Sequence, residues 1–375
     1  MKYLLEELVD LKIGRTPPRK EQWWFSNTSG VKWVSIKDMG DSGRFIDNTS
    51  EFLVKDSIDK FNIPIVKKGT VILSFKLTVG RVSITQDDML TNEAIAQLPV
   101  KDEKILNPMF LYYYLKSYNF NQLGSTSSIA QAINSKYLKK MEIDIPEISM
   151  QNKIVDILSS IDSYIECNQK INNNLEQQAM AIFKSWFVDF EPFNRKVPNN
   201  WVKYKLSDFL PVITGKKNAN VSSSIGIYPF FSCSQDITWT DEYSFEGNAI
   251  LVAGNGDFNV KFYNGKFEAY QRTYVLIPDN PRFSAWLFYV AKYNLNKITA
   301  SARGSVIKFI TKGCLEDFSF YAPSNLDDFD IIDQFTVINN IIASNDQENA
   351  LLSKLRDMLL PKLMSGELDV SDIDL

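Results

Sequence analysis

The feature that most constrains this chain is an apolar seam of ten positions that occurs twice. Its positions are spaced alternately by four and three residues, the spacing of a coiled coil. The first copy is Ile154, Leu158, Ile161, Ile165, Asn168, Asn172, Leu175, Ala179, Ile182 and Trp186. Adding 177 to each number gives Ile331, Phe335, Ile338, Ile342, Asn345, Asn349, Leu352, Arg356, Leu359 and Leu363. Both asparagines return in the same places, which predicts two copies of one unit, each a globular block followed by a long helix.

The length of 375 residues suits two domains with helical connectors better than a single core. Short strand patterns, mixed with one helix headed by Asn-Pro in each block, predict an α+β fold with a twisted, partly curled sheet. No run is long and apolar enough to span a membrane, and the start lacks a signal-peptide pattern, so a cytoplasmic protein is expected. The expected parts are globular block 1–148, helix 149–188, linker 189–200, globular block 201–326, helix 327–365 and acidic tail 366–375.

The second block aligns with the first at scattered frame positions. Leu206 and Asp208 align with Leu8 and Asp10, and Gly215 aligns with Gly14 after an insertion of three residues. Segments 15–30 and 75–90 scarcely agree with their counterparts 216–232 and 254–268. A common frame with divergent surface segments predicts one task performed on two different targets.

The composition argues against catalysis by this chain. It contains no histidine, which excludes Ser–His and Cys–His catalysis and histidine-ligated metal sites. No phosphate-binding loop of the G-x-x-x-x-G-K-[ST] type occurs. Cys167, Cys233 and Cys314 show no metal-binding spacing. We therefore expect no catalytic residues, no metal and no cofactor of its own.

The charge is distributed unevenly. The chain has net charge −4, yet residues 1–149 hold 20 Lys and Arg against 18 Asp and Glu, and residues 189–326 hold 15 against 12. Residues 327–375 hold 3 against 11. Both globular blocks are therefore mildly basic, and a tight grip on DNA would need cations from a partner.

The short linker predicts that the two helices pair antiparallel with a pseudo-twofold centre. Asn168 would then face Asn349, and Asn172 would face Asn345. Asparagines buried in such a seam lower stability but fix the register, although a wet, loose coil that merely tolerates them is the alternative. Arg356 would face Ile161 and reach Asp162 or Glu166 instead. A helix of about 36 residues spans roughly 54 Å, or about 16 base pairs.

The order of several motifs along the chain, together with the repeat, resembles the specificity subunit of Type I restriction–modification systems. The resemblance covers nearly the whole chain. The motifs are Gly14-Arg15-Thr16-Pro17, Val31-Lys32-Trp33-Val34, Gly124-Ser125-Thr126 running to Ile133-Asn134, Ile145-Pro146 with Gln151, segment 183–190 (FKSWFVDF) and segment 359–367 (LLPKLMSGE). The second block departs from the family pattern, because Thr214-Gly215-Lys216-Lys217 lacks the Thr-Pro of the first.

The resemblance implies a non-catalytic subunit with two target-recognition domains, each reading one half of a bipartite sequence in double-stranded DNA. Two helices would hold the domains apart and dock methyltransferase subunits, expected to be two, which bind S-adenosylmethionine and methylate adenine. A motor–nuclease subunit that uses ATP and Mg²⁺ and cuts unmodified DNA is left open. None of this chemistry would belong to the present chain.

The residues expected to read DNA are cations and amides in or beside loops, because such groups form paired hydrogen bonds with bases or contact phosphates. A solvated surface charge is the alternative for each. The candidates are Arg15, Lys76, Arg81, Ser125, Thr126 and Lys136 in the first block, and Lys216, Lys217, Asn255, Arg272, Arg303 and Lys308 in the second. Gly254-Asn255-Gly256 is interpreted as a turn, and Trp33, Trp201, Trp239 and Trp286 are interpreted as core residues.

The partner subunits are expected to dock on the aromatic end of the first helix, at Phe183, Trp186, Phe187 and Phe190, which exceeds the apolar surface that a two-helix seam needs. Packing under the globular block is the alternative. Two other functions stay open. One is a coiled-coil scaffold whose globular domains bind protein or carbohydrate, and the other is an enzyme using Asp257 with Glu268 or Glu93.

Overall fold

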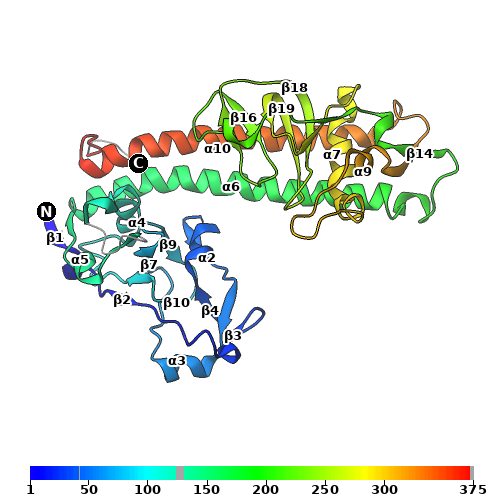
Figure 1. Ribbon diagram of the computed structural model, residues 1–375. Coiled ribbons are helices and arrows are strands. Elements are labelled where there is room, and N and C mark those ends of the chain that lie inside the picture. Colours follow the sequence, from blue (N-terminus) through cyan, green and yellow to red (C-terminus); the bar gives the residue numbers. More distant parts are fainter. Residues whose placement is uncertain (42, 124–130, 372–375) are drawn as a thin grey trace. The chain divides into compact units, whose positions relative to one another are not determined.

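The computed structural model describes residues 1–41, 43–123 and 131–371, which form two compact units (Figure 1). The first unit comprises Met1–Glu166 with Asn349–Leu375, and the second comprises Cys167–Glu348. Each unit therefore contains one globular domain and half of each long helix. We call residues 1–147 domain 1 and residues 201–326 domain 2.

Domain 1 consists of short strands with small helices between them. Its elements are β1 (Lys2–Leu4), α1 (Leu5–Leu8), β2 (Lys12–Ile13), η1 (Gln22–Trp24), β3 (Phe25–Ser26), β4 (Val31–Val34), α2 (Ile36–Asp41), β5 (Phe45–Ile46), β6 (Glu51–Leu53), α3 (Lys55–Phe61), β7 (Val71–Ser74), β8 (Lys76–Leu77), β9 (Val82–Thr85), β10 (Leu90–Thr91), β11 (Ile95–Leu98), α4 (Pro108–Ser117), η2 (Phe120–Leu123), β12 (Gln131–Ala132), α5 (Ser135–Lys139) and β13 (Glu142–Asp144).

The rest of the chain has longer elements. They are α6 (Ile148–Phe187), η3 (Glu191–Phe193), β14 (Trp201–Lys205), η4 (Leu206–Asp208), β15 (Val212–Thr214), η5 (Ala219–Val221), β16 (Tyr228–Phe231), β17 (Thr238–Thr240), β18 (Phe245–Ala253), β19 (Val260–Ala269), β20 (Thr273–Leu276), η6 (Pro281–Phe283), α7 (Ser284–Tyr293), α8 (Leu295–Ile298), α9 (Lys312–Glu316), β21 (Ser319–Pro323) and α10 (Ile331–Ser365).

The main sheet has the same strand order in both domains. In domain 1 the order is β2-β11-β7-β9-β5, and in domain 2 it is β15-β20-β18-β19-β16 with β17 added at the edge. In both sheets the first four strands are antiparallel, and the fifth runs parallel to its neighbour. This agreement confirms the predicted α+β repeat. Domain 1 also has a second sheet, β10-β4-β6-β3.

Backbone hydrogen bonds show how the two domains correspond residue by residue. Leu5 N donates to Met141 O at 2.8 Å, and Leu206 N donates to Phe318 O at 2.9 Å. Because this bond ends the first β-ladder in each domain, Leu206 corresponds to Leu5.

The next residues keep the same offset of 201. The side chains of Glu7 and Asp208 accept hydrogen bonds from the backbone N–H groups of Leu4 and Lys205, both at 2.7 Å. The predicted alignment of Leu206 and Asp208 with Leu8 and Asp10 was therefore wrong. With this offset Gly215 falls on Gly14, and the proposed three-residue insertion disappears.

Each main sheet carries a core on both faces, because alternate residues of a strand point to opposite sides. In β7, Val71 and Leu73 pack in the core that includes α4, whereas Ile72 packs in a separate cluster with Val34. In domain 2, Ile250 and Val252 face α7, whereas Leu251 joins the opposite cluster. The predicted Asn caps are present, since Asn107 and Asn280 accept from the N–H groups of Met109 and Arg282.

The long helices lie close to their expected ranges. α6 begins at Ile148, one residue before the expected start, and α10 begins at Ile331, four residues after it. Seam residues such as Leu158 and Phe335 are fully buried. The described part of the acidic tail packs on the first unit, because Val370 is buried in its core and Lys153 Nζ donates to Ser371 O at 2.5 Å.

In the second unit the two helices pair antiparallel. Asn345 Nδ2 donates to Asn172 Oδ1 at 2.8 Å, which confirms that predicted pair. Asn172 Nδ2 also donates to Asp346 Oδ1 at 2.8 Å, and Asn168 Nδ2 donates to Glu348 Oε2 at 2.9 Å. Three further points stay predictions: the pairing of Asn168 with Asn349, the control of the helix register by the asparagines, and strict coiled-coil packing.

In the first unit a buried polar cluster joins α4 to both helices. Tyr113 Oη donates to Asp162 Oδ2 at 2.7 Å, and Arg356 Nη1 donates to Asp162 Oδ1 at 2.9 Å, as the seam predicted. Burial is the largest influence on the Tyr113 phenol and, with the Asp162 carboxylate, raises its pKa. Arg44 extends the cluster from domain 1, donating to Ser159 O, Ser163 Oγ and Glu166 Oε2 of α6.

Among the described residues, no helix is long and apolar enough to cross a membrane.

We expect Arg356→Ala to lower the free energy of unfolding of the first unit by about 3 kcal/mol, because it leaves the buried Asp162 carboxylate without its cation. The half of the helix pair in the second unit suggests a matched control. There Asn339 and Ala179 occupy the positions equivalent to 162 and 356, so the repeat itself combines an amide with an alanine. Arg356→Ala combined with Asp162→Asn should therefore recover most of the loss in urea unfolding. A single variant as stable as the wild type would contradict the assigned role.

Candidate nucleic-acid interface

At one end of the domain 1 sheet, the chain passes so close to the neighbouring strand that only glycine fits. A Cβ on Gly14 would lie 2.1 Å from Thr91 O. Gly14 N donates to Ile95 O at 3.2 Å, and Arg15 N donates to Thr91 O at 2.9 Å. These bonds fix the backbone immediately before Arg15, whose exposed side chain donates from Nη1 to Phe61 O at 3.0 Å.

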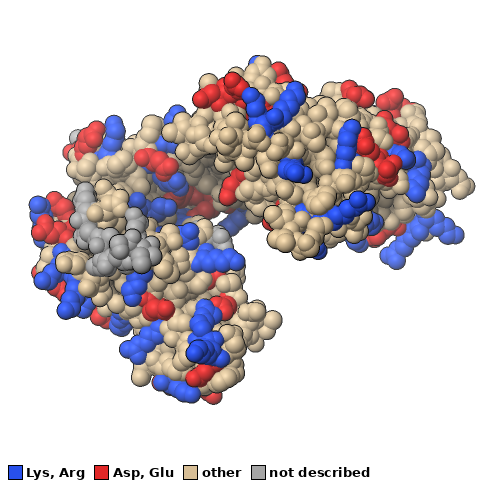
Figure 2. Space-filling view, in the orientation of Figure 1, with Lys and Arg blue, Asp and Glu red and all other residues tan. Residues whose placement is uncertain are grey.

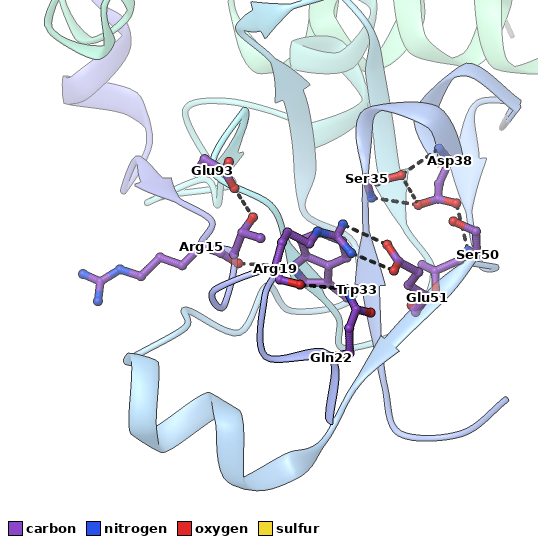
Figure 3. A network of polar contacts seen from close by, with 11 residues as sticks. Arg15, Arg19, Gln22, Trp33, Ser35, Asp38, Ser50, Glu51 and Glu93 are labelled. Atoms are coloured by element: carbon purple, nitrogen blue, oxygen red, sulfur yellow. Dashed lines mark hydrogen bonds and ion pairs between the residues drawn. The ribbon is translucent and has the colours of Figure 1, made fainter. Parts of the chain in front are cut away.

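The loop after Arg15 is held by a second arginine (Figure 3). Arg19 forms two hydrogen bonds with the Glu51 carboxylate, at 2.7 and 2.9 Å, and the bond to Glu51 is the main cause that raises the pKa of Arg19. Its guanidinium also lies 4.4 Å from the ring centre of Phe25 and 4.8 Å from that of Trp33. Trp33 Nε1 donates to Arg15 O at 3.1 Å, so the loop is anchored on both sides.

A second polar group in Figure 3 has a structural role. Asp38 accepts hydrogen bonds from Ser35 N, Ser35 Oγ and Ser50 N at 2.6 to 2.8 Å. Burial opposes ionisation, but these hydrogen bonds to Ser35 and Ser50 prevail and lower the pKa of Asp38. The cluster ties the start of α2 to the segment before β6.

The other predicted residues of domain 1 have different surroundings. Lys76 lies on β8, which pairs with β12, and its Nζ is 5.1 Å from the ring centre of Phe75. Lys136 is exposed on α5. Hydrogen bonds from Phe75 N to Ala94 O and from Ile133 N to Phe75 O connect these segments to the Gly14 end of the sheet.

Arg81 is engaged in packing. Its Nη1 donates to Ile36 O at 2.6 Å, and a Cβ on Gly40 would lie 2.2 Å from the same guanidinium nitrogen. This contact supports α2, so the structure gives Arg81 a packing role in place of a solvent-facing one. Ser125 and Thr126 lie outside the described residues.

Domain 2 repeats the close approach. A Cβ on Gly215 would lie 2.2 Å from Tyr270 O, and Gly215 N donates to Thr273 O at 2.8 Å. Gly254 N donates to Arg272 O at 2.8 Å, and Ile310 N donates to Gly254 O at 2.9 Å. The equivalent two bonds in domain 1 run from Phe75 N to Ala94 O and from Ile133 N to Phe75 O. The two domains thus share the bonding at this end of the sheet.

These bonds bring together the segments that carry all six predicted residues of domain 2. Gly256 N donates to Lys308 O at 3.0 Å, and Asn255 pairs with Phe309. Phe309 in turn pairs with Arg303, and Gln271 N donates to Lys217 O at 2.9 Å. The predicted residues themselves are Lys216, Lys217, Asn255, Arg272, Arg303 and Lys308.

Most of these cations are open to solvent. Lys217 pairs with the exposed Glu242 at 2.8 Å, which raises the pKa of Lys217 and lowers that of Glu242. An exposed pair of this kind contributes little stability and leaves the lysine available to an anion. Within the described part of the chain, Arg272, Arg303 and Lys308 are exposed and form no ion pair, and Figure 2 shows Lys and Arg interspersed with acidic residues over both domains.

Two of the four residues predicted to dock a partner, Phe183 and Phe187, are not available for docking, which corrects that part of the prediction, whereas docking on Trp186 and Phe190 stays a prediction. Phe183 and Phe187 are buried in the core of the second unit, and their rings stack on each other at 5.3 Å. Trp186 and Phe190 are half-buried and lie against Phe193 and Trp201 respectively. The apolar surface beyond the seam is used to bury domain 2 on the helices, the alternative stated above.

Sequence reasoning missed two exposed apolar sites. Trp23 in η1 is 66% exposed beside the Arg15 loop, and Val306 is 93% exposed beside Arg303. For Val306 the available signal was the apolar pair Val306-Ile307 in a polar segment that contains Gly304. Trp33, Trp201 and Trp286 are buried as predicted, whereas Trp239 is 40% exposed.

The carboxylates considered for catalysis have other roles. Glu268 is fully buried and accepts from Ser244 Oγ at 2.6 Å and Ala269 N at 2.9 Å. Glu93 accepts from Thr16 in domain 1, and Asp257 is exposed. Among the described residues, no group of three or more Cys, Asp or Glu side chains is arranged to hold a metal ion.

Comparison with known proteins identifies the family. The model of the Type I restriction modification DNA specificity domain matches residues 1–177 and again residues 198–354. The chain belongs to this family. The two matches confirm the internal repeat, and they assign the chain to DNA specificity and not to catalysis.

Individual relatives agree with this assignment. The EcoDI specificity subunit of Escherichia coli is 35% identical over 177 residues, which are 46% of this chain and 40% of that protein. The MjaIX specificity subunit of Methanocaldococcus jannaschii is 23% identical over 98% of this chain and 93% of its own length. The crystal structure of the S subunit from M. genitalium covers 97% of this chain and 95% of its own, with 16% identity and a TM-score of 0.59, which shows the shared fold.

We expect Gly14→Ala to lower the free energy of unfolding of domain 1 by about 3 kcal/mol, because the added methyl group overlaps the backbone at Thr91. Urea unfolding followed by tryptophan fluorescence measures this change. Gly43→Ala is the control, since nothing lies within 4 Å of a Cβ there. Equal stability of the two variants would show that the sheet end tolerates the methyl group.

Proposed function

We propose that domain 1 and domain 2 each read one half of a bipartite DNA sequence, and that α6 and α10 hold them at a fixed spacing. In this proposal the helices also dock methyltransferase subunits, expected to be two, which bind S-adenosylmethionine and methylate adenine. A motor–nuclease subunit joins in systems that restrict DNA. The present chain supplies sequence recognition alone.

The observation that supports this proposal most strongly is the combination of a shared frame with different loops. Gly14 and Gly215 make the same close approach, and the bonds around Gly254 repeat those around Phe75. The segments that leave this frame differ in sequence and bear different cations. Two domains built alike, with unlike side chains at the same end, suit the recognition of two different half-sites.

The solvent-facing cations support contact with DNA. Arg15 in domain 1 and Lys216, Arg272, Arg303 and Lys308 in domain 2 lie on the connected segments and are exposed. Cations placed in this way neutralise phosphates and release counterions, which gives salt-dependent affinity. Base recognition then depends on the amides and arginines among them.

The direct test is a methylation map. The chain is co-expressed with its methyltransferase, and host DNA is sequenced by a method that reports N6-methyladenine. We expect one new motif with two defined halves around a fixed undefined gap. Replacing residues 198–326 by the corresponding segment of another specificity subunit should change only one half. A soluble complex that leaves no new motif would favour the scaffold alternative.

Phosphate contact by Arg15 is tested by the salt dependence of DNA affinity in the same complex. We expect Arg15→Ala to reduce the slope of log K against log salt by about one, because one phosphate contact is lost. Lys101→Ala is the control, since Lys101 follows the opposite end of β11. An unchanged slope in both variants would remove Arg15 from the interface.

A further inference from the structure

The hairpin loop at residues 303–309 is built rigidly at its base. Arg303 N donates to Phe309 O at 2.9 Å, and Phe309 N donates to Arg303 O at 2.8 Å. Gly304 has φ +107°, and a Cβ there would lie 2.2 Å from Ile307 O. The turn is thus closed by two hydrogen bonds and by a position that requires glycine.

The base of this loop is tied to the shared frame of domain 2. Phe309 pairs with Asn255, and Gly256 N donates to Lys308 O at 3.0 Å. Tyr274 Oη donates to Ile310 O at 2.9 Å, next to the loop. The tip therefore has a defined position relative to the predicted DNA-reading segments, although it projects from the domain as the ochre loop of Figure 1.

The tip itself is aliphatic and exposed. Val306 is 93% exposed and Ile307 is 59% exposed. Both line an open hollow of about 590 Å³ whose other wall includes Asn296 and Thr299, so no described residue covers them. Two exposed, β-branched side chains on a pre-ordered turn present apolar surface that folding has left available to a partner.

The charges beside the tip indicate the partner. Arg303 and Lys308 are exposed on its two sides and form no ion pair within the described part of the chain. Cations on both arms of a narrow hairpin match the phosphates that border a DNA groove, and the major groove admits a two-stranded ribbon. The loop is also continuous with the other cations of the predicted interface.

Aliphatic side chains cannot donate or accept hydrogen bonds, so they read few features of a base pair. In the major groove, the feature that matches them is the 5-methyl group of thymine. We propose that Val306 and Ile307 enter the major groove and recognise a thymine methyl group in the half-site read by domain 2, with Arg303 and Lys308 on the flanking phosphates. This inference rests on the proposed function.

The test measures binding of the full chain, in complex with its methyltransferase, to a duplex of the mapped sequence. Uracil, which lacks the methyl group, replaces each thymine of both half-sites in turn. We expect one replacement in the domain 2 half-site to weaken wild-type binding by about fourfold, the effect of losing one buried methyl contact. The variant Val306→Ser with Ile307→Ser should bind both duplexes equally.

Ile225→Ser is the matched control, because Ile225 is an 82% exposed aliphatic residue elsewhere in domain 2. It should keep the wild-type response to uracil. If every uracil duplex binds the wild type as well as thymine does, or if the domain 2 half-site contains no thymine on either strand, the inference is overturned. Equal uracil responses of wild type and the double variant would also overturn it.

Failure of the proposed function has a different signature. It would appear as wild-type complex with no sequence preference at all, before any uracil is introduced. Specific wild-type binding without coupling between the uracil replacement and the tip variant leaves the proposed function intact and removes only the role of the tip.

Discussion

A backbone contact that only glycine allows sets the position of the loops proposed to read DNA in both domains. At Gly14 and at Gly215 the chain approaches the opposite strand so closely that a Cβ would overlap a carbonyl oxygen. The residue that follows each glycine is a cation, Arg15 or Lys216. Because the backbone is fixed immediately before it, the cation starts from a defined point although its side chain is long. The same constraint brings the segments at Thr91 and Tyr270 to this end of the sheet, so several loops depend on one contact.

The repeat and the long helices were predictable because their signals are periodic. A seam of ten positions tolerates a residue that is not apolar, such as Arg356, without losing its period, and the structure pairs that arginine with the buried Asp162. The alignment of the domain starts failed for the opposite reason. Leu5 with Glu7 and Leu8 with Asp10 are both a leucine followed two residues later by an acid. Only the hydrogen bonds of Leu5 and Leu206 to distant carbonyl groups decide between them, and such partners leave no mark in a local pattern.

The candidate site was predictable in its cations but not in its geometry. Residue type and loop position indicated the six residues of domain 2, whose segments the structure connects. The same reasoning included Arg81, which a single contact with Ile36 O turns toward the protein. It also predicted that a partner subunit docks on the aromatic end of α6. A surplus of apolar residues indicates a covered surface, but it does not identify the segment that covers it. Phe183 and Phe187 are covered by domain 2 of the same chain. The exposed Val306 shows the converse, since its apolar character suggested no role in binding.

The two halves of the helix pair show what the repeat has kept. Positions 162 and 339 are equivalent in the seam numbering, and each accepts a hydrogen bond from a buried tyrosine, Tyr113 or Tyr289. Both tyrosines are the sixth residue of a ten-residue helix, α4 or α7, so they occupy equivalent places in the two domains. The acceptors differ, since one is a carboxylate paired with Arg356 and the other is an amide. The buried acceptor on the long helix therefore receives its hydrogen bond from a tyrosine in either half, although the acceptor itself has changed. The repeat keeps this contact where its residues have diverged, and in the same way one frame carries loops of unlike sequence.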